Sequence, residues 1–240
     1  MKIKFLLTLA ILINGLLYAQ AQKIDTLKKH VLLKKSILPA SLIGVGIIIN
    51  KSTFEKTFQK DIRNSVGTNY KTNIEDYLAF APVAQMYIAD IAGVKSKNHW
   101  FDQSKNLFIS NLFSVGITFA LKKSNHKIRP NGEADSFPSG HSALAFTNAT
   151  VLYHEFHNTA PGLAYSGYAF ATTVGIFRML NNKHFLSDVL VGAGIGIAVT
   201  NLVFYFKPLK NFNPFKKVKN VSIFPTLSDN TYGLYANYQF

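Results

Sequence analysis

Three short clusters of cationic and histidine residues lie between positions 122 and 188 of a largely apolar stretch of chain. They are Lys122-x6-Arg129-Pro130, Pro138-Ser139-Gly140-His141 and Arg178-x5-His184-x3-Asp188. Together they supply three cations, two imidazoles and one carboxylate. A phosphate gains charge on its oxygens as it is transferred, so catalysis of that transfer depends on positioned cations and N–H groups. The set therefore indicates a site that binds a phosphate and moves its phosphoryl group through a histidine.

The three cations differ in how they can hold a phosphate. The guanidinium groups of Arg129 and Arg178 can each donate to two oxygens, whereas the ammonium of Lys122 acts as a point charge. We expect Lys122 at the end of a helix and Arg129 in a loop that Pro130 stiffens. A solvated lysine at a helix C-terminus is the alternative interpretation of Lys122 taken alone.

The second cluster comes directly before a predicted helix. Ser139 can be an ordinary N-cap residue, and the same geometry offers free N–H groups and the positive end of the helix dipole to an anion. Gly140 lets the backbone approach a phosphate closely. His141, in the first turn, has an ordinary pKa near neutrality and can protonate a leaving oxygen as a general acid.

The third cluster pairs an imidazole with a carboxylate. His184 and Asp188 are four residues apart, which places them on one face at the start of the last predicted helix. A carboxylate bonded to one ring nitrogen fixes the tautomer and leaves the other nitrogen free to attack phosphorus. Arg178 cannot share that face on a continuous helix, so we expect a break at Asn181-Asn182.

These clusters resemble the motifs of the type 2 phosphatidic acid phosphatase (PAP2) superfamily, which also includes bacterial class A acid phosphatases and vanadium haloperoxidases. The resemblance implies that His141 is the acid, that His184 forms a phosphohistidine and that Asp188 orients it. It also implies phosphate-binding positions at Lys122, Arg129, Ser139, Gly140 and Arg178. The phosphatase reaction of the family needs no metal, so we expect no cofactor. Phe177 departs from the family pattern, in which serine often precedes the arginine.

The apolar segments around the clusters predict an all-α bundle of six helices, which the resemblance to PAP2 proteins also implies. They are Ile37–Asn50, Ile74–Val94, Lys105–Leu121, His141–His157, Gly162–Leu180 and Leu186–Phe206. Lys51–Lys71 is predicted to be a charged connector. Three glycines in the last segment predict the close approach of a neighbouring helix. The C-terminal tail alternates apolar and polar residues on both sides of Ser228-Asp229-Asn230, which predicts a β-hairpin.

The N-terminus has the features of a secretory leader. Lys2 and Lys4 precede an apolar run, and Ala19-Gln20-Ala21 is a small-x-small cleavage site. An uncleaved anchor helix is the alternative. The predicted organisation is a signal peptide at 1–21, a basic amphipathic lead-in at 22–36, a PAP2-type phosphatase domain at 37–207 and a C-terminal tail at 208–240.

The leader predicts an exported protein of the cell envelope, inner-membrane associated or periplasmic, with its active site facing the periplasm. Only Leu186–Phe206 is long and apolar enough to be a comfortable membrane span. The basic residues after it favour a cytoplasmic tail. A cleaved leader followed by six spans would instead put both motif loops in the cytoplasm, so the number of spans stays open.

The charge balance restricts the partners. A net charge of +14 favours phosphate esters and anionic lipid surfaces. Nucleic acid is not expected, because the lysines are scattered and form no basic stripe interleaved with aromatic residues. The chain has no cysteine, which excludes disulfides and thiolate metal sites. The sequence leaves the oligomeric state open.

The function hypothesis is a metal-independent phosphatase that hydrolyses phosphomonoesters or diphosphates, favouring lipid substrates, through a phosphohistidine. A soluble periplasmic acid phosphatase of broad specificity is the first alternative. A vanadate-dependent haloperoxidase ranks below it, because the chain is short and shows no added domain for halide chemistry. A non-catalytic phosphate-binding protein of the envelope is a further alternative, although binding alone would need only the cations.

Overall fold

The computed structural model describes the backbone of residues 26–206, 221–228 and 231–238, and the side chains of residues 33–206. Within these ranges there are eight helices and two strands. They are α2 (Thr26–Ile49), α3 (Thr53–Val66), α4 (Ile74–Leu78), α5 (Ala81–Ile91), α6 (Trp100–Asn125), α7 (Gly140–Phe156), α8 (Pro161–Leu180), α9 (Leu186–Tyr205), β1 (Val221–Ser228) and β2 (Thr231–Tyr238). The predicted all-α fold is confirmed. The predicted signal peptide lies outside the described residues.

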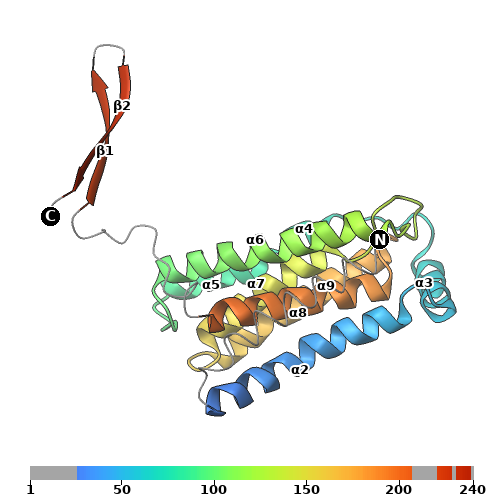
Figure 1. Ribbon diagram of the computed structural model, residues 1–240. Coiled ribbons are helices and arrows are strands. Elements are labelled where there is room, and N and C mark those ends of the chain that lie inside the picture. The colour runs from blue at the N-terminus through green and yellow to red at the C-terminus, as the bar shows by residue number, and fades with distance from the viewer. Residues whose placement is uncertain (1–25, 207–220, 229–230, 239–240) are drawn as a thin grey trace.

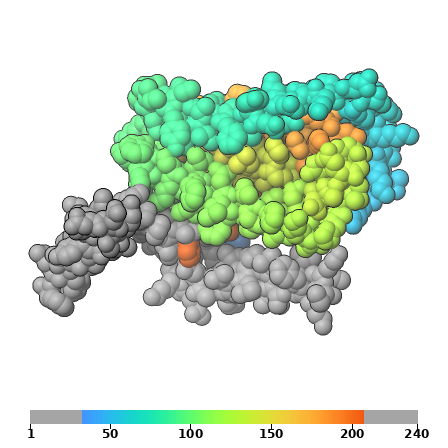
Figure 2. Space-filling view, turned by 90° about the horizontal axis from the view of Figure 1, so that it is seen from above, coloured from blue at the N-terminus to red at the C-terminus, as the bar shows by residue number. Residues whose placement is uncertain are grey.

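Helix α7 lies at the centre of the bundle. It packs along α8 and α9, and α5 and α6 also contact it, while α2 runs along α9 (Figure 1). Figure 2 shows α5 (teal) and α6 (green) at the surface of one face, with part of α7 (yellow) visible between them. The short helix α3 is bent by 94° from α2 and contacts α8 and α9 at one end of the bundle.

Glycines in α9 allow the close helix packing that the sequence predicts. A Cβ atom at Gly192 would collide with the carbonyl oxygen of Ser139 at the start of α7, and one at Gly194 would collide with Ile43 of α2. Only a residue without a side chain fits between such close backbones. Helix α9 is therefore held against both α7 and α2.

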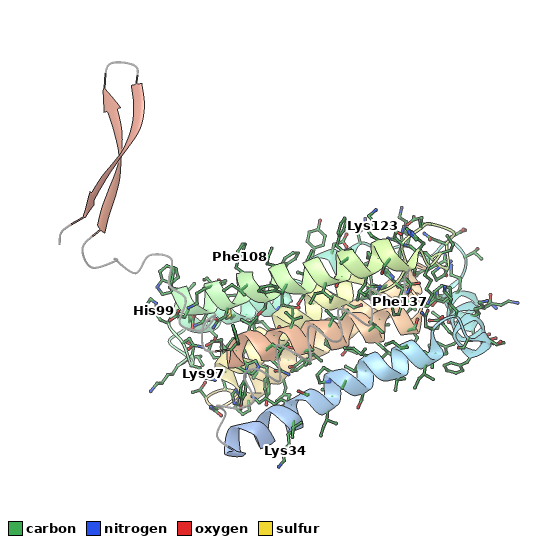
Figure 3. All side chains as sticks on the ribbon, in the orientation of Figure 1. Lys34, Lys97, His99, Phe108, Lys123 and Phe137 are labelled. Carbon is green, nitrogen blue, oxygen red and sulfur yellow. The ribbon has the colours of Figure 1, made fainter. Side chains whose placement is uncertain are left out.

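The polarity of α6 is reversed relative to a helix of an ordinary soluble protein. Five of its six buried residues are polar, namely Gln103, Asn106, Ser110, Ser114 and Thr118, and the sixth is Ile109. Its outward residues include Phe108, Leu112 and Phe119, which are 67%, 58% and 61% exposed. Phe108 points away from the bundle (Figure 3). Helix α6 therefore presents a contiguous apolar strip to its surroundings, where a soluble protein would present polar residues.

One helix in the described part of the chain has the length and composition of a membrane span. It is α9, with a mean hydropathy of 1.7, and 72% of its most apolar window is buried inside the bundle. The pair formed by Leu33–Ile49 and Thr53–Val66 passes the same test together as a bent unit.

The predicted connector at Lys51–Lys71 is wrong, because most of it is α3. The Ser52 side chain caps this helix by accepting a hydrogen bond from the Glu55 backbone N–H. The polar residues Gln59 and Arg63 donate to the Met179 and Leu180 carbonyl oxygens at the end of α8. The charged segment is thus a helix whose polar side chains donate hydrogen bonds to the free carbonyl oxygens at the C-terminal end of α8.

Two further boundaries differ from the prediction. Ile74–Val94 is not one helix, because the chain breaks at Ala79-Phe80 and α5 begins with Pro82 in its first turn, where proline is tolerated. The lead-in and the first apolar segment instead form the single helix α2, which continues through Pro39.

The C-terminal tail forms the predicted hairpin. Strands β1 and β2 pair antiparallel, with Val221 opposite Tyr238 and Ser228 opposite Thr231.

Candidate active site

The three clusters meet at one end of the bundle, beside a cavity of about 590 Å³. Arg129, His141 and Arg178 line this cavity, and Lys183, Glu75 and Asp76 line it as well. They come from the loop after α6, the start of α7, the end of α8, the loop between α8 and α9, and helix α4. The cavity thus collects residues from all three sequence clusters, together with two carboxylates that the sequence analysis did not single out.

Backbone contacts join the second and third clusters. The N–H of Ser139 donates to the carbonyl oxygen of Asp188 at 2.9 Å. Ser139 is buried and caps α7, where its hydroxyl accepts from the N–H and the hydroxyl of Ser142. Gly140 begins the helix beside the end of the Lys122 side chain. The first turn of α7 therefore lies against both neighbouring clusters.

The loop between α8 and α9 brings Arg178 and His184 together. The predicted break is present, since α8 ends at Leu180 and α9 begins at Leu186. The N–H of His184 donates to the carbonyl oxygen of Arg178 at 3.2 Å. The prediction that His184 lies on the last helix with Asp188 is wrong, because His184 precedes α9.

His184 and Asp188 nevertheless remain adjacent and buried. Nδ1 of His184 lies 3.5 Å from Oδ2 of Asp188, a close contact that does not have the geometry of a hydrogen bond. Burial lowers the pKa of His184 to about 4, although the carboxylate of Asp188 acts in the opposite direction. The imidazole is therefore neutral at neutral pH, the form that a nucleophile requires.

A buried lysine that the sequence analysis missed holds the other side of Asp188. Lys127 donates from Nζ to Oδ1 of Asp188 at 2.9 Å, to both carboxylate oxygens of Glu55 at 3.0 Å, and to the Ser187 hydroxyl at 2.9 Å. On the other oxygen, Oδ2, Asp188 accepts from the Ser136 hydroxyl and from the Phe185 backbone N–H. These donors fix the carboxylate that faces His184.

The sequence does not point to this network of charged residues. Lys127 lies two residues before Arg129, inside the first cluster, but no spacing distinguishes it from Lys123. Glu55 lies in the segment predicted to be a connector, so nothing in the sequence linked it to the site. Lys123 itself is exposed beside Asp135, as expected for a surface lysine.

The guanidinium groups of Arg129 and Arg178 each keep a buried donor free of protein partners. Arg129 pairs with Glu133 at 2.7 Å, and Arg178 pairs with Glu75 at 3.3 Å, both through Nη1. The Nε atoms of both arginines are buried and have no hydrogen-bond partner among the described residues. A buried donor without an acceptor costs free energy, so these two N–H groups indicate a site where a ligand supplies the acceptors.

Lys122 is partly buried in the same region. It donates to the Asp135 carbonyl oxygen at 2.6 Å. Burial and the neighbouring Arg129 guanidinium lower the pKa of Lys122 to about 8. An anion bound between these cations would relieve their mutual repulsion.

His141 faces the cavity from the first turn of α7. Its Nε2 lies 2.9 Å from Oδ1 of Asp76, which belongs to α4. Burial and the Arg178 guanidinium lower the pKa of His141, while Asp76 acts in the opposite direction. No spacing or motif in the sequence associates Asp76 with this histidine.

The remaining histidines of the described helices have other surroundings. His154 is buried at the far half of α7, where it bonds Asn201 and stacks on Phe204. His126 is exposed at the C-terminal cap of α6, beside Asp135. Among the described residues, no group of three or more histidine, aspartate or glutamate side chains is arranged to hold a metal ion.

Comparison with known proteins assigns this part of the chain to a family. Residues 103–212 match the model of the PAP2 superfamily. This segment holds all three clusters and the helices that carry them. The resemblance to the PAP2 superfamily that the three clusters suggested is confirmed.

A curated relative and two solved structures are also similar. The lipid A 1-phosphatase of Porphyromonas gingivalis is 31% identical over 152 residues, which cover 62% of this chain and 34% of that protein. The chain thus spans about a third of the length of that relative. The crystal structure of Aquifex aeolicus LpxE matches with 22% identity and a TM-score of 0.46, covering 61% of this chain and 94% of that one. A PAP2-type phosphatidylglycerolphosphate phosphatase from Bacillus subtilis matches with 20% identity and a TM-score of 0.47, covering 75% and 99%.

Proposed function

We propose that this protein is a metal-independent phosphatase that hydrolyses phosphomonoesters or diphosphates of lipids through a phosphohistidine on His184. The observation that carries the proposal is the pair of buried, unpartnered Nε donors on Arg129 and Arg178. They line or border the cavity beside a neutral, buried imidazole. Two fixed guanidinium donors suit a tetrahedral oxyanion, and the imidazole supplies a nucleophile.

The reaction has two steps. In the first, the phosphate lies between Arg129, Arg178 and Lys122, and the free ring nitrogen of His184 attacks phosphorus. The bond from phosphorus to the leaving oxygen breaks as His141 gives that oxygen its proton. The phosphoryl group is then bonded to His184, and its negative oxygens remain among the cations.

In the second step, water replaces the histidine. His141, now neutral, removes a proton from a water molecule as the water oxygen bonds to phosphorus. The bond between phosphorus and His184 breaks, inorganic phosphate leaves, and both imidazoles return to their starting protonation. Asp188 keeps His184 in the required tautomer throughout, and Lys127 and Ser136 hold Asp188 in place.

Two features favour lipids over soluble esters as substrates. Helix α6 presents exposed Phe108, Leu112 and Phe119 outward, which suits contact with acyl chains. The curated relative is named as a phosphatase of a lipid, lipid A. The candidate substrates are phosphatidate, phosphatidylglycerophosphate, polyprenyl diphosphate and lipid A 1-phosphate. The site would face the periplasm if the predicted leader directs export.

Phosphate release from these four lipids and from p-nitrophenyl phosphate, measured in detergent with EDTA present, tests the proposal. We expect release from at least one lipid in EDTA, and loss of release in His184→Ala. His157→Ala is the matched control, because His157 lies at the far end of α7 and bonds only a local carbonyl. Full activity in His184→Ala would overturn the proposal, and activity on the soluble ester alone would favour the acid phosphatase alternative.

The covalent intermediate has its own test. Brief reaction with a substrate labelled with ³²P at phosphorus should leave an acid-labile, base-stable label on the protein. The label should be absent in His184→Ala and should accumulate when turnover is stopped early. A protein that binds phosphate without catalysis would take up no covalent label.

A further inference from the structure

Asp76 and His141 form a second carboxylate–imidazole pair, in addition to Asp188 and His184, and both residues line the cavity. Oδ1 of Asp76 lies 2.9 Å from Nε2 of His141. The two residues come from separate elements, since Asp76 lies on α4 and His141 begins α7. This distance is well within a hydrogen bond, and shorter than the 3.5 Å that separates His184 from Asp188.

The segment that carries Asp76 is fixed at both ends. Before α4, the Asn181 side chain exchanges two hydrogen bonds of 2.9 Å with the backbone of Thr72. After α4, the Asn148 amide donates to the Ala79 carbonyl oxygen at 2.8 Å. Both asparagines belong to the bundle that carries the site. The Asp76 carboxylate is therefore held where it meets His141, although the side chain itself is 52% exposed.

Its neighbour Glu75 strengthens this attachment. Glu75 is buried, pairs with Arg178 at 3.3 Å and accepts from the Asn181 amide. Glu75 is thus engaged by the end of α8, while Asp76 remains available to His141. The two consecutive carboxylates of α4 serve different elements of the site.

The charges around His141 otherwise oppose its protonated form. Arg178 faces it from α8, and Arg129, Lys183 and Arg63 line the same cavity. A site that concentrates cations for a phosphate disfavours an imidazolium beside them. Asp76 and Glu75 on α4 are the acidic residues that line this cavity, and only Asp76 is within hydrogen-bond distance of the His141 ring.

We propose that Asp76 is a positioning residue for His141, which fixes its ring through Nε2 and favours the protonated form needed for general acid catalysis. This inference rests on the proposed function. Asp76 accepts from Nε2–H, so Nδ1 carries the proton that passes to the leaving oxygen. After transfer, His141 is neutral and its hydrogen bond to Asp76 is retained.

The first test is independent of turnover. The titration of the His141 ring can be followed by NMR of the full-length protein in detergent micelles, with His141→Gln used to assign the signal. Asp76→Asn should move this titration to lower pH, because a carboxylate that favours the imidazolium is lost. Asp61→Asn is the matched control, since Asp61 is exposed on α3 and does not line the cavity. An unchanged titration in Asp76→Asn would overturn the proposal.

The second test uses kcat and KM to distinguish two roles of Asp76. In one, Asp76 positions His141, and in the other it hinders the anionic substrate in the cavity. We expect Asp76→Asn to lower kcat about tenfold, within the range for impaired general acid catalysis. KM should stay the same or fall, because a negative charge near an anionic substrate is removed. The falling limb of the pH–kcat profile should move to lower pH, and Asp76→Glu should recover most of the activity.

A kcat that is unchanged or raised in Asp76→Asn would mean that Asp76 competes with the substrate, and the proposal would be wrong. Failure of the phosphatase assignment can be distinguished from failure of the proposal for Asp76. A wild-type protein that releases no phosphate from any ester would refute the phosphatase assignment, whereas the NMR titration would still decide whether Asp76 controls His141.

Discussion

At the scale of single residues, the two histidines of the site differ in their surroundings. His184 is buried against Asp188, and its pKa is lowered to about 4. His141 lies at the cavity wall, 39% exposed and bonded to Asp76. Two imidazoles with different environments can take two different roles, one neutral as nucleophile and one protonated as acid.

This difference predicts a bell-shaped pH dependence of kcat/KM. Below a pH of about 4, His184 becomes protonated and loses its nucleophilic form, so activity should fall on the acid side. His141 must be protonated, and its pKa is lowered from 6.5, so activity should fall as pH rises past that lowered value. We therefore expect a mildly acidic optimum in a profile of kcat/KM on a soluble phosphoester, corrected for ionisation of the ester. A rate that keeps rising above pH 7 would contradict these roles.

Lys127 provides a second prediction, on stability. Lys127→Met would leave the buried carboxylates of Glu55 and Asp188 without their shared cation. Removing one partner of a buried ion pair costs about 3–5 kcal/mol in free energy of unfolding. Denaturant unfolding should show this loss, whereas Lys56→Met, at an exposed position on α3, should change stability by less than about 0.5 kcal/mol.

The double variant Glu55→Gln/Lys127→Met gives the internal check. Because the uncompensated charge of Glu55 is removed as well, we expect the double variant to be less destabilised than Lys127→Met alone. Equal stability of Lys127→Met and the wild type would show that this buried network does not hold the site together.

At the scale of elements, the packing of α9 against α7 sets the position of Ser139. Gly192 lies so close to the Ser139 carbonyl oxygen that no Cβ atom fits between them. The same short segment of α7 donates to the Asp188 carbonyl oxygen through the N–H of Ser139. The approach of these two helices therefore places the second cluster against the third.

Gly192→Ala should separate these helices and disturb the site. Overpacking of this kind costs about 1–3 kcal/mol, and the displacement of Ser139 should lower kcat as well. Gly116→Ala is the matched control, because it lies within α6 with open space around its Cβ position. There the substitution should leave activity unchanged and stabilise the helix by up to about 1 kcal/mol. Thermal unfolding and phosphate release would measure both effects, and wild-type behaviour of Gly192→Ala would contradict the packing argument.

At the scale of the whole molecule, the distribution of polarity favours a lipid environment. Helix α6 buries five polar residues and exposes Phe108, Leu112 and Phe119. Burial of the polar set satisfies hydrogen bonds inside the bundle, as between Thr147 and Ser114 at 2.8 Å. An exposed apolar strip of this size is costly in water and favourable against acyl chains.

Charged residues on this strip should weaken lipid binding without unfolding the bundle. We expect Phe108→Asp/Leu112→Asp to reduce sedimentation with vesicles of mixed neutral and anionic phospholipid several-fold, because both residues are exposed on α6. Thr57→Asp, which adds a charge at an exposed position on α3, should bind nearly as the wild type does. Unchanged sedimentation of the double variant would argue against α6 as a lipid-facing helix.

The sequence was sufficient to predict the family and the main helices. The spacing of His184 and Asp188 and the break at Asn181-Asn182 are local features, and local features are encoded in neighbouring residues. The charged segment at Lys51–Lys71 was mispredicted as a connector, although Ser52 and Glu55 have the spacing of a helix N-cap. Only the docking of this helix on α8 depends on partners more than a hundred positions away, such as the Met179 carbonyl oxygen.

By itself, then, the sequence determined which reactive groups are present, their order, and the helical character of the segments that carry them. Only the tertiary structure decided which charges meet. Asp76 reaches His141, and Glu55 reaches Asp188 through Lys127, across long intervals of sequence. The physical reason is that helix formation depends on residues a few positions apart in the sequence. The charge partners of a buried group depend instead on how whole helices pack.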